Sequence, residues 1–472
     1  MTFRFDNSYL RDLPGAYLRL APAVAPAPRL LALNRDLAAA LGLDPDALAA
    51  DGAAWFSGAA LPPGAEPAAL AYAGHQFGGF SPQLGDGRAH LLGEIVAPDG
   101  RRWDLQLKGS GRTPFSRGGD GKAAVGPMLR EYLISEAMQA LGVPTTRSLA
   151  VVATGEEIWR DSGKLPGAVL ARVAASHIRV GTFQFFSARG ETDKLQALVD
   201  YTIARHYPAA AAAEVPALAL FDAAVARQAG LIAEWMGLGF IHGVMNTDNM
   251  ALSGETIDYG PCAFMEGYAP DTVFSSIDRQ GRYAYANQPR IMGWNLARLA
   301  ETLLPVFDAD ETRAIDLANA RLTAIAGQYE RSWLAVMRRK LGLLGEEAGD
   351  AALVAGLLAA MPGEDWTLTF RRLADAAEGE GPFAGPLRDW LPAWRARLAP
   401  GAQARLLAAN PSVIPRNHLV EAALDAATAG EMAPFEALLA AVRDPFGPER
   451  GRERFTLPAP QGLAPYVTFC GT

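Results

Sequence analysis

Strand patterns begin at about residue 71 and give way to helical periodicity from about residue 190 onward. Residues 89–109 predict a β-hairpin around Pro98-Asp99-Gly100, because these turn residues separate two strand-like runs. A helix is predicted over about 124–141, where apolar residues recur every four positions. Two more strand-like runs follow this helix. The order strand, strand, helix, strand, strand predicts a small antiparallel sheet with one helix packed on it.

The first 70 residues are rich in Ala and Pro and mix short helical patterns with turns. We interpret them as an N-terminal extension that ends in a linker near Pro62–Pro67. Within this extension, apolar residues recur at spacings of three and four over 30–43. That spacing predicts a packed helix rather than disorder.

The composition of the 472-residue chain excludes several classes of protein. Hydrophobic residues make up 50% and charged residues 20%, which excludes wholesale disorder. The 43 Lys and Arg residues against 51 Asp and Glu residues give a net charge of −8, which disfavours nucleic-acid binding through phosphate neutralisation. Two cysteines, Cys262 and Cys470, cannot build a disulfide scaffold, and no signal-peptide or transmembrane pattern is apparent. We therefore expect a bacterial cytoplasmic protein with no membrane or nucleic-acid partner.

Two glycine-rich loops carry basic residues. Gly85-Asp86-Gly87-Arg88 precedes a strand and Gly109-Ser110-Gly111-Arg112 follows one, but neither completes a GxGxxG fingerprint. Each loop alone is better explained as an ordinary tight turn. Basic residues among the glycines favour polyphosphate binding, since phosphate is held by backbone N–H groups beside Lys and Arg. These basic residues are Arg88, Lys108, Arg112, Arg117 and Lys122.

Lys108 ends the second strand of the predicted hairpin. It shares a face with Gln106, opposite Leu105 and Leu107, and Glu131 lies on the following helix. A lysine on a core strand paired with a helix carboxylate fixes nucleotide phosphates in kinase-like folds. The alternative is a solvent-facing lysine with an unrelated surface glutamate.

The segment 242–249 is polar, and Asp258 follows it with Tyr259 as its neighbour. This arrangement resembles a kinase catalytic loop followed by a DFG-type motif with Tyr in place of Phe. The Asp and Asn oxygens suit Mg²⁺ or Mn²⁺. A kinase carries its catalytic Asp about five residues before the Asn. That position is Val244 in this chain, and an acid stands instead at Asp248.

These features predict an α+β, protein-kinase-like two-lobed fold, in which a small antiparallel sheet with one helix precedes a helical lobe. Arg172 and Arg179 are expected beside the cleft, although arginines of a surface face explain them equally well. The predicted parts are an N-terminal extension (1–70), an N-lobe (71–165), a C-lobe with the catalytic and metal-binding loops (166–290), and a helical C-terminal region with a Cys-containing tail (291–472).

Four stretches of the chain resemble the selenoprotein O family, whose bacterial members are called YdiU. The stretches are YAGHQFGGFSPQLGDGRAHLLGE, DLQLKGSGRTPFSRGGDGKAAVGPMLREYLISEAM, HGVMNTDNM with IDYGPCAFME, and NPSVIPRNHLVE. The resemblance implies a kinase-like pseudokinase fold without the usual catalytic Asp. It also implies a different reaction, in which ATP binds in a flipped orientation and AMP moves to Ser, Thr or Tyr hydroxyls of proteins. Pyrophosphate is released, Mg²⁺ or Mn²⁺ is needed, and the chain itself is one candidate substrate.

The resemblance gives roles to individual positions of this sequence. Asp248 matches the proton acceptor, and Asn249 and Asp258 match the metal ligands. Glu131 matches the helix partner of the lysine. The positions that match nucleotide-binding residues are Gly85, Gly87, Arg88, Lys108, Asp120, Gly121, Arg172, Arg179 and Asp258, with the two arginines at the phosphate end.

The resemblance further implies redox control through the C-terminal tail. Cys470 is the third residue from the end, where some relatives carry selenocysteine. Cys262 is its candidate partner, although we expect the partner usual in the family further downstream, near Phe274.

Two other classes of protein stay open at this point. One is an ordinary kinase that transfers the γ-phosphoryl group, against which Val244 argues. The other is a non-catalytic nucleotide-binding pseudokinase that acts by docking partners. The retained Lys108, Glu131, Asn249 and Asp258 argue against this second class, because a pure scaffold has no need of a full metal set.

Overall fold

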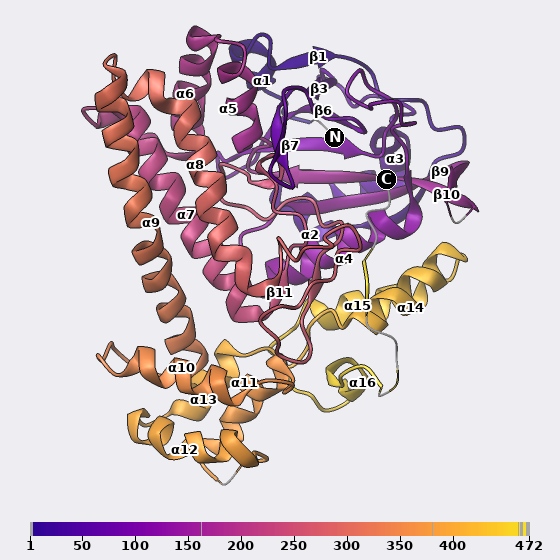
Figure 1. Cartoon of the computed structure of the whole chain (residues 1–472). Helices are drawn as coiled ribbons and strands as arrows, with labels where there is room; N and C mark the ends of the chain where they lie inside the picture. The colour runs from indigo at the N-terminus through magenta and orange to yellow at the C-terminus, as the bar shows by residue number, and fades with distance from the viewer. Residues whose placement is uncertain (1–2, 162, 380, 461, 463–465, 469–472) are drawn as a thin grey trace.

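The computed structural model describes residues 3–161, 163–379, 381–460, 462 and 466–468. An antiparallel sheet forms one part of the molecule, and long helices stand beside it (Figure 1). Shorter helices gather at the end of these long helices that is farther from the sheet (Figure 1). The predicted combination of an antiparallel sheet with many helices is therefore confirmed.

Within the described residues, eight strands form one antiparallel sheet in the order β1-β3-β6-β7-β10-β9-β2, with β8 paired to β10. These strands are β1 (Tyr17–Arg19), β2 (Arg29–Leu33), β3 (Ala68–Leu70), β6 (Ala89–Val96), β7 (Arg102–Lys108), β8 (Ala123–Ala124), β9 (Arg147–Arg160) and β10 (Gly163–Ala174). The predicted hairpin is present as β6 and β7, and its register pairs Ala89 with Lys108. Two shorter ladders lie outside the sheet, β4 (Gly74–Gln76) with β5 (Gly79–Ser81) and β11 (Phe240–Ile241) with β12 (Ala263–Phe264).

The helices fall into a short N-terminal group, one helix between strands, and a long C-terminal series. The first five are α1 (Ser8–Asp12), α2 (Arg35–Ala40), α3 (Pro45–Ser57), α4 (Val125–Ala140) and α5 (Val180–Ser187). The next five are α6 (Thr192–His206), α7 (Pro216–Leu238), α8 (Gln288–Phe307), α9 (Glu311–Lys340) and α10 (Asp350–Ala360). The last six are α11 (Trp366–Ala376), α12 (Gly385–Arg397), α13 (Ala402–Ala409), α14 (Asn417–Thr428), α15 (Ala433–Val442) and α16 (Glu453–Thr456).

Helices cover both faces of the sheet. On one face, Phe56 of α3 joins a buried apolar cluster that includes Leu105 of β7. On the other face, Leu129 of α4 shares a buried cluster with Leu170 of β10. Because side chains alternate along a strand, Lys108 and Gln106 lie on the opposite side of β7 from Leu105, which faces α3. This alternation brings Lys108 to the helix that carries the candidate carboxylate.

The first 70 residues join this sheet rather than standing apart from it. Strand β2 pairs with β9, and β3 lies between β1 and β6. The predicted helix over 30–43 is wrong at its start, because the apolar run there pairs with β9 as strand β2. Helix α2 begins only after Asn34, whose side chain accepts a hydrogen bond from the Leu37 N–H at 3.2 Å. The division of the chain into four parts stays a prediction.

Helix α7 lies at the centre of the helical part. It is long and apolar enough to cross a membrane by length and composition, and 61% of its most apolar window is buried inside the protein. Phe221 of α7 shares one large buried cluster with Leu296 of α8 and Met337 of α9. These contacts are those of a helix in a protein core.

Helices α14 and α15 return to pack against α4 (Figure 1). Leu424 of α14 shares a buried cluster with Leu129 of α4. Arg130 of α4 forms an ion pair with Glu421 of α14, with 2.9 Å between Nη1 and Oε1. The C-terminal region therefore braces the helix that carries Glu131.

Replacement of Phe56 tests whether the first 70 residues are part of the core. Phe56 is fully buried against the sheet, so Phe56→Ala leaves a cavity and should lower the free energy of unfolding by about 3–5 kcal/mol. Leu61→Ala is the control, since Leu61 is 42% exposed. Denaturant unfolding of the full chain measures both. An equally small change in the two variants would contradict this packing.

Candidate active site

Lys108 and Glu131 form a buried ion pair between the sheet and helix α4. Lys108 is the last residue of β7 and is 7% exposed, and Glu131 is 2% exposed. Lys108 Nζ donates a hydrogen bond to Glu131 Oε2 at 2.6 Å. Alternation along β7 turns the lysine away from buried Leu107 and toward α4. The structure therefore brings together the two residues that the sequence pairs.

Asp258 collects three cationic side chains. Its Oδ1 accepts hydrogen bonds from Lys108 Nζ at 2.6 Å and from Arg172 Nη1 at 2.5 Å. Its Oδ2 lies 3.4 Å from Nη1 of Arg179. Arg172 Nη1 also donates to Glu131 Oε1 at 3.2 Å. The backbone of Asp258 has a φ of +62°, which is uncommon for a residue other than glycine, and these ion pairs offset its cost.

Electrostatic interactions keep this cluster ionised. Burial opposes the charge of Asp258, but Arg172, Lys108 and Arg179 hold the pKa of its carboxyl group well below the usual range. Burial also opposes the charge of Arg172, and Asp258 and Glu131 nevertheless raise its pKa. Buried charges of this kind are tolerated only when they are paired. The ion pair of Asp258 with Arg172 is therefore stabilised in its charged form, and the hydrogen bonds of the cluster depend on one another.

Gln106 and Asp86 support the cluster, and the sequence analysis assigned neither of them. Gln106 Oε1 accepts a hydrogen bond from Arg172 Nη2 at 2.6 Å, and its Nε2 donates to Asp86 Oδ2 at 2.8 Å. Asp86 Oδ1 lies 3.8 Å from Arg179 Nη2. Burial raises the pKa of Asp86 to about 6 against the opposing charge of Arg179. Both residues had a signal in the sequence, since Gln106 shares the face of Lys108 and Asp86 stands inside the first glycine-rich loop.

The loop from His242 to Asn249 is held from within. The His242 ring stacks on Trp235 with 5.3 Å between ring centroids, and its Nε2 lies 2.8 Å from the carbonyl oxygen of Ile257. Asn249 Nδ2 donates a hydrogen bond to the carbonyl oxygen of Val244 at 3.0 Å. The amide nitrogen of Asn249 is thus engaged by the loop, and its amide oxygen is the atom suited to bind a cation.

Asp248 lies on the same loop and is 6% exposed. Its Oδ2 accepts a hydrogen bond from Gln76 Nε2 at 3.0 Å, while its Oδ1 has no hydrogen-bond partner among the described residues. Arg179 Nη1 donates to the backbone carbonyl of Asp248 at 2.9 Å, which joins this residue to the cation cluster. Burial raises the pKa of Asp248 to about 6, although the Gln76 hydrogen bond and Arg179 oppose the rise. Sequence reasoning missed Gln76, whose only signal was its place in the HQFGGF stretch.

The first glycine-rich loop packs tightly against the second. Gly85 has a φ of +92°, and a Cβ there would lie 2.5 Å from the Phe115 ring. A Cβ on Gly87 would lie 2.9 Å from the carbonyl oxygen of Phe115. The carbonyl oxygen of Arg88 accepts a hydrogen bond from the Gly109 N–H at 2.6 Å. Only glycine therefore fits at positions 85 and 87.

Two predicted nucleotide-binding residues lie on the outer part of the second loop. A Cβ on Gly121 would lie 2.2 Å from backbone atoms of the same loop, and its φ is +70°. Asp120 is exposed, and its carboxylate accepts hydrogen bonds from the Lys122 N–H and from Arg160 Nη1 at 2.9 Å each. The structure thus places Asp120 on a surface ion pair rather than in the cation cluster.

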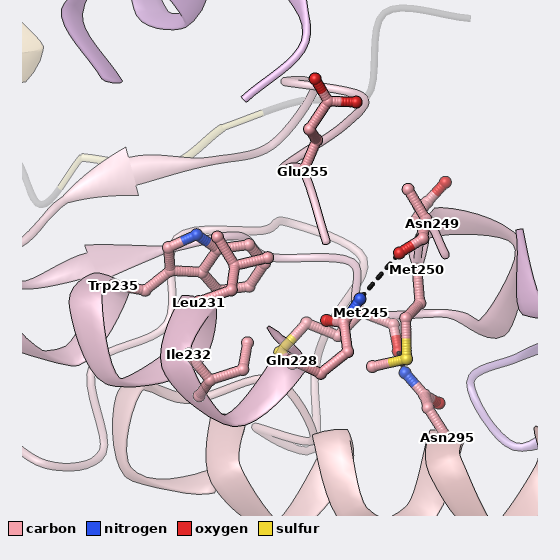
Figure 2. Close-up of a pocket in the computed structure, with 10 residues that line it drawn as sticks. Gln228, Leu231, Ile232, Trp235, Met245, Asn249, Met250, Glu255 and Asn295 are labelled. Carbon is pink, nitrogen blue, oxygen red and sulfur yellow. Dashed lines mark hydrogen bonds between the residues drawn. The ribbon is translucent and has the colours of Figure 1, made fainter. Parts of the chain in front are cut away.

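A small cavity lies between the loop and helices α7 and α8 (Figure 2). Its lining residues are Gln228, Leu231, Ile232, Trp235, Met245, Asn249, Met250, Ala251, Glu255 and Asn295. Gln228 Nε2 donates a hydrogen bond to the carbonyl oxygen of Ala251 at 2.7 Å across it (Figure 2). Its interior volume of about 10 Å³ matches a single water molecule. The cavity therefore cannot hold a nucleotide.

Comparison with known proteins identifies the family of this chain. A family model described as "Protein adenylyltransferase SelO" matches residues 1–381. The chain belongs to the SelO family. It is 64% identical over 481 residues to a protein of Cereibacter sphaeroides (strain KD131 / KCTC 12085) named protein nucleotidyltransferase YdiU, with 100% of each chain covered. It is 57% identical over 488 residues to a protein of the same name from Rhizobium johnstonii, with 100% of this chain and 97% of the relative covered. The family resemblance of the four sequence stretches is confirmed.

SelO family membership implies an enzyme with a nucleotide substrate and a divalent metal. Among the described residues, no group of three or more His, Cys, Asp or Glu side chains is placed to hold a metal ion. Asn249 and Asp258 supply one amide and one carboxylate oxygen donor. Such a small set fits Mg²⁺ that is held jointly by the protein and by substrate phosphates. The residues present therefore fit a metal that binds together with the nucleotide.

The two cysteines of this SelO protein differ in what the structure describes. Cys262 is a free, fully buried thiol, and burial raises its pKa to about 11. Cys470 lies outside the described residues. The described Thr468 donates its N–H to the carbonyl oxygen of Phe274 at 2.8 Å and its hydroxyl to that of Pro261 at 2.8 Å. The tail thus passes beside both candidate positions for a partner, and pairing of Cys262 with Cys470 stays a prediction.

Replacement of Lys108 tests the central ion cluster. Lys108→Met removes one cation from Glu131 and Asp258, so we expect ATP binding to weaken by about 2–5 kcal/mol while the protein still folds. The control is Lys164→Met, since Lys164 is half exposed and pairs with exposed Glu157. Isothermal titration with ATP and Mg²⁺ measures the affinity, and circular dichroism reports the fold. Unchanged ATP affinity in Lys108→Met would remove this residue from the nucleotide site.

Proposed function

We propose that this chain is a protein adenylyltransferase, which transfers AMP from ATP to Ser, Thr or Tyr hydroxyls of proteins and releases pyrophosphate. One observation carries the proposal. Three buried cations converge on Asp258. One of them, Arg179, also donates a hydrogen bond to the backbone carbonyl of Asp248. The Asp248 side chain has one oxygen, Oδ1, without a hydrogen-bond partner among the described residues. The description of the SelO family as protein adenylyltransferases supports the same reaction. The chain itself is among the candidate substrates.

The three cations are proposed to hold the terminal phosphates of ATP. Lys108 and Arg172 now share the carboxylates of Asp258 and Glu131, and Arg179 lies beside Asp258. A triphosphate carries more negative charge and more acceptor oxygens than one carboxylate, so it competes for the same cations. Transfer of the cations to phosphate frees the Asp258 oxygens. The same cations then stabilise the charge that develops on the leaving pyrophosphate.

Asn249 and the freed Asp258 are the proposed metal ligands. Mg²⁺ or Mn²⁺ bound there together with the phosphates supplies charge neutralisation at the phosphorus under attack. Asp258 contributes a charge as well as an oxygen, whereas Asn249 contributes an oxygen alone. Asp258 is therefore the stronger of the two ligands.

Asp248 is the proposed acceptor of the hydroxyl proton. A carboxyl group with a pKa of about 6 is ionised at neutral pH and is more basic than an ordinary aspartate. Gln76 binds its Oδ2, while its Oδ1 is buried without a hydrogen-bond partner among the described residues, so proton acceptance at Oδ1 requires that the incoming hydroxyl gain access to this oxygen. Asp248 would use the same oxygen, Oδ1, whether it accepts the proton of the hydroxyl or only orients the hydroxyl.

We propose a kinase-like two-lobed arrangement for this site. Its support is the order of the parts: the lysine ends a strand of the sheet, its carboxylate partner lies on the packed helix, and the polar loops follow in the helical part. The regions 71–165 and 166–290 are the proposed lobes. An ordinary kinase is the second candidate, but the position of its catalytic acid is Val244, a buried apolar residue that cannot accept a proton. The proposed bacterial cytoplasmic location rests on composition and on the bacterial relatives.

The position of a radioactive label distinguishes AMP transfer from phosphoryl transfer. We expect the protein to retain label from ATP labelled at the α-phosphorus, to gain the mass of one AMP, and to release pyrophosphate. Autoradiography and intact-mass spectrometry of the full chain measure these outcomes without a known substrate. Asp248→Asn should lower the transfer rate by about 10²–10⁴-fold, because it removes the proton acceptor and keeps the shape.

The matched control for Asp248→Asn is Asp222→Asn, since Asp222 is about half exposed on α7. This control should transfer AMP at the wild-type rate. Retention of γ-label without α-label would make the chain an ordinary kinase. Nucleotide binding without retention of either label on any protein would make it a non-catalytic pseudokinase.

Removal of metal is expected to stop the reaction. EDTA should abolish AMP transfer, and added Mg²⁺ or Mn²⁺ should restore it. Asp258→Asn should reduce metal-dependent ATP binding more than Asn249→Ala, because it removes a charge. Titration of ATP with and without Mg²⁺ compares the two variants. Full turnover in the presence of chelator would contradict the metal assignment.

A further inference from the structure

The hairpin β4–β5 is fastened to the loop that carries Asp248. The His75 N–H donates to Thr247 Oγ1 at 2.7 Å, and the Phe77 N–H donates to Asn246 Oδ1 at 3.2 Å. The residue between them, Gln76, binds the carboxylate of Asp248 itself. Three successive hairpin residues thus bind the three loop residues 246–248, although not in the same order. The hairpin and the proposed proton acceptor therefore keep a constant distance from each other.

This hairpin presents two phenyl rings to solvent, Phe77 at its turn and Phe80 in strand β5. Phe77 is 40% exposed and Phe80 is 45% exposed. Phe77 has a φ of +51°, a left-handed conformation that costs free energy for a bulky residue. The hydrogen bonds of its N–H and an edge contact between its ring and Tyr283 at 5.1 Å hold it there. Exposed aromatic rings on a rigidly held backbone are typical anchors of a binding surface.

Arg282 lies beside the tip of this hairpin. The guanidinium carbon of Arg282 lies 3.7 Å from the place of a Cβ on Gly78 and 4.8 Å from the centre of the Trp294 ring. In the part of the chain that the structure describes, no carboxylate lies within ion-pair distance of it. Arg298 lies 5.0 Å from the centre of the same ring. Burial lowers the pKa of His75, and the charges of Arg298 and Arg282 lower it further, although Arg298 also forms an ion pair with Glu301.

We propose that Phe77, Phe80 and Arg282 form the docking surface for the acceptor segment of the protein substrate. This inference rests on the proposed function and names the substrate class: an extended segment with an apolar side chain and a carboxylate within a few residues of the acceptor hydroxyl. The apolar side chain packs on the two rings, and the carboxylate pairs with Arg282. An extended chain advances about 3.3 Å per residue, so a few residues span the step from the tip to Asp248.

The other ligand of this reaction is the nucleotide, whose base could stack on the same rings. Acceptor and nucleotide are distinguished by their separate Michaelis constants. The unpaired charge of Arg282 favours the acceptor, because an adenine base carries no negative charge to satisfy it. Variants of this surface should therefore change the KM for the acceptor and leave the KM for ATP unchanged.

The test uses the full chain, ATP, Mn²⁺ and an array of synthetic peptides that each contain one Ser, Thr or Tyr. Flanking positions carry Leu, Glu or Lys in all combinations. The wild-type protein should favour peptides with Leu and Glu near the hydroxyl. Arg282→Glu should lower kcat/KM for Glu-containing peptides by about tenfold or more and should favour Lys-containing peptides instead. Phe80→Ala should raise the peptide KM and leave kcat and the KM for ATP unchanged.

Two control variants match these changes elsewhere on the surface. Arg372→Glu reverses the charge of an exposed arginine on α11, and Trp159→Ala removes a 70% exposed ring at the far end of β9. Neither should alter peptide preference. Three outcomes would each overturn the docking inference while leaving the proposed function intact. They are labelling of peptides without sequence preference, a changed KM for ATP in Arg282→Glu, and self-labelling of the protein with no labelled peptide. Absence of AMP label on every peptide and protein would instead overturn the proposed function.

Discussion

The site depends on the burial of three cations at one point between the sheet and the helical part. A buried charge without a partner costs several kcal/mol, so Lys108, Arg172 and Arg179 each require a carboxylate or an equivalent acceptor. Glu131 supplies one from helix α4, and Asp258 supplies another from the loop between β11 and β12. The sheet, helix α4 and the loop are thereby joined through ion pairs. A displacement of any one of them therefore alters the ion pairs of the other two.

Much of the remaining chain holds these partners in place. Helices α14 and α15 cover α4, and the Arg130–Glu421 ion pair ties the helix of Glu131 to the C-terminal region. The first 70 residues extend the sheet on both sides of β6, β7, β10 and β9. Arg179 joins the cation cluster to Asp248, so the proposed phosphate site and the proposed proton acceptor share one guanidinium group. This shared contact gives a physical reason for the two to act together.

Local sequence patterns predicted the helix and the strands that carry the site. They could not predict contacts between residues that are far apart in the sequence. The hairpin β6–β7, helix α4 and the Lys108–Glu131 pair follow from strand alternation and helical periodicity within 23 residues of sequence. The Gln76–Asp248 hydrogen bond joins residues that are 172 positions apart, and no local pattern encodes it. Strand β2 was mistaken for the start of a helix, because an apolar run shows its partner only when the sheet is formed. The residues predicted a nucleotide, a metal and a loop without the kinase acid, whereas AMP transfer came from the family resemblance.

In the proposed reaction, the cation cluster holds the terminal phosphates of ATP, so that the α-phosphorus faces Asp248. A crystal structure of the full chain with a non-hydrolysable ATP analogue and Mn²⁺ tests this claim most directly. We expect the α-phosphorus to be the phosphorus nearest to Asp248 Oδ1, with the terminal phosphates hydrogen-bonded to Lys108, Arg172 and Arg179. A γ-phosphorus nearest to Asp248, with those three cations still bound to Asp258, would contradict it.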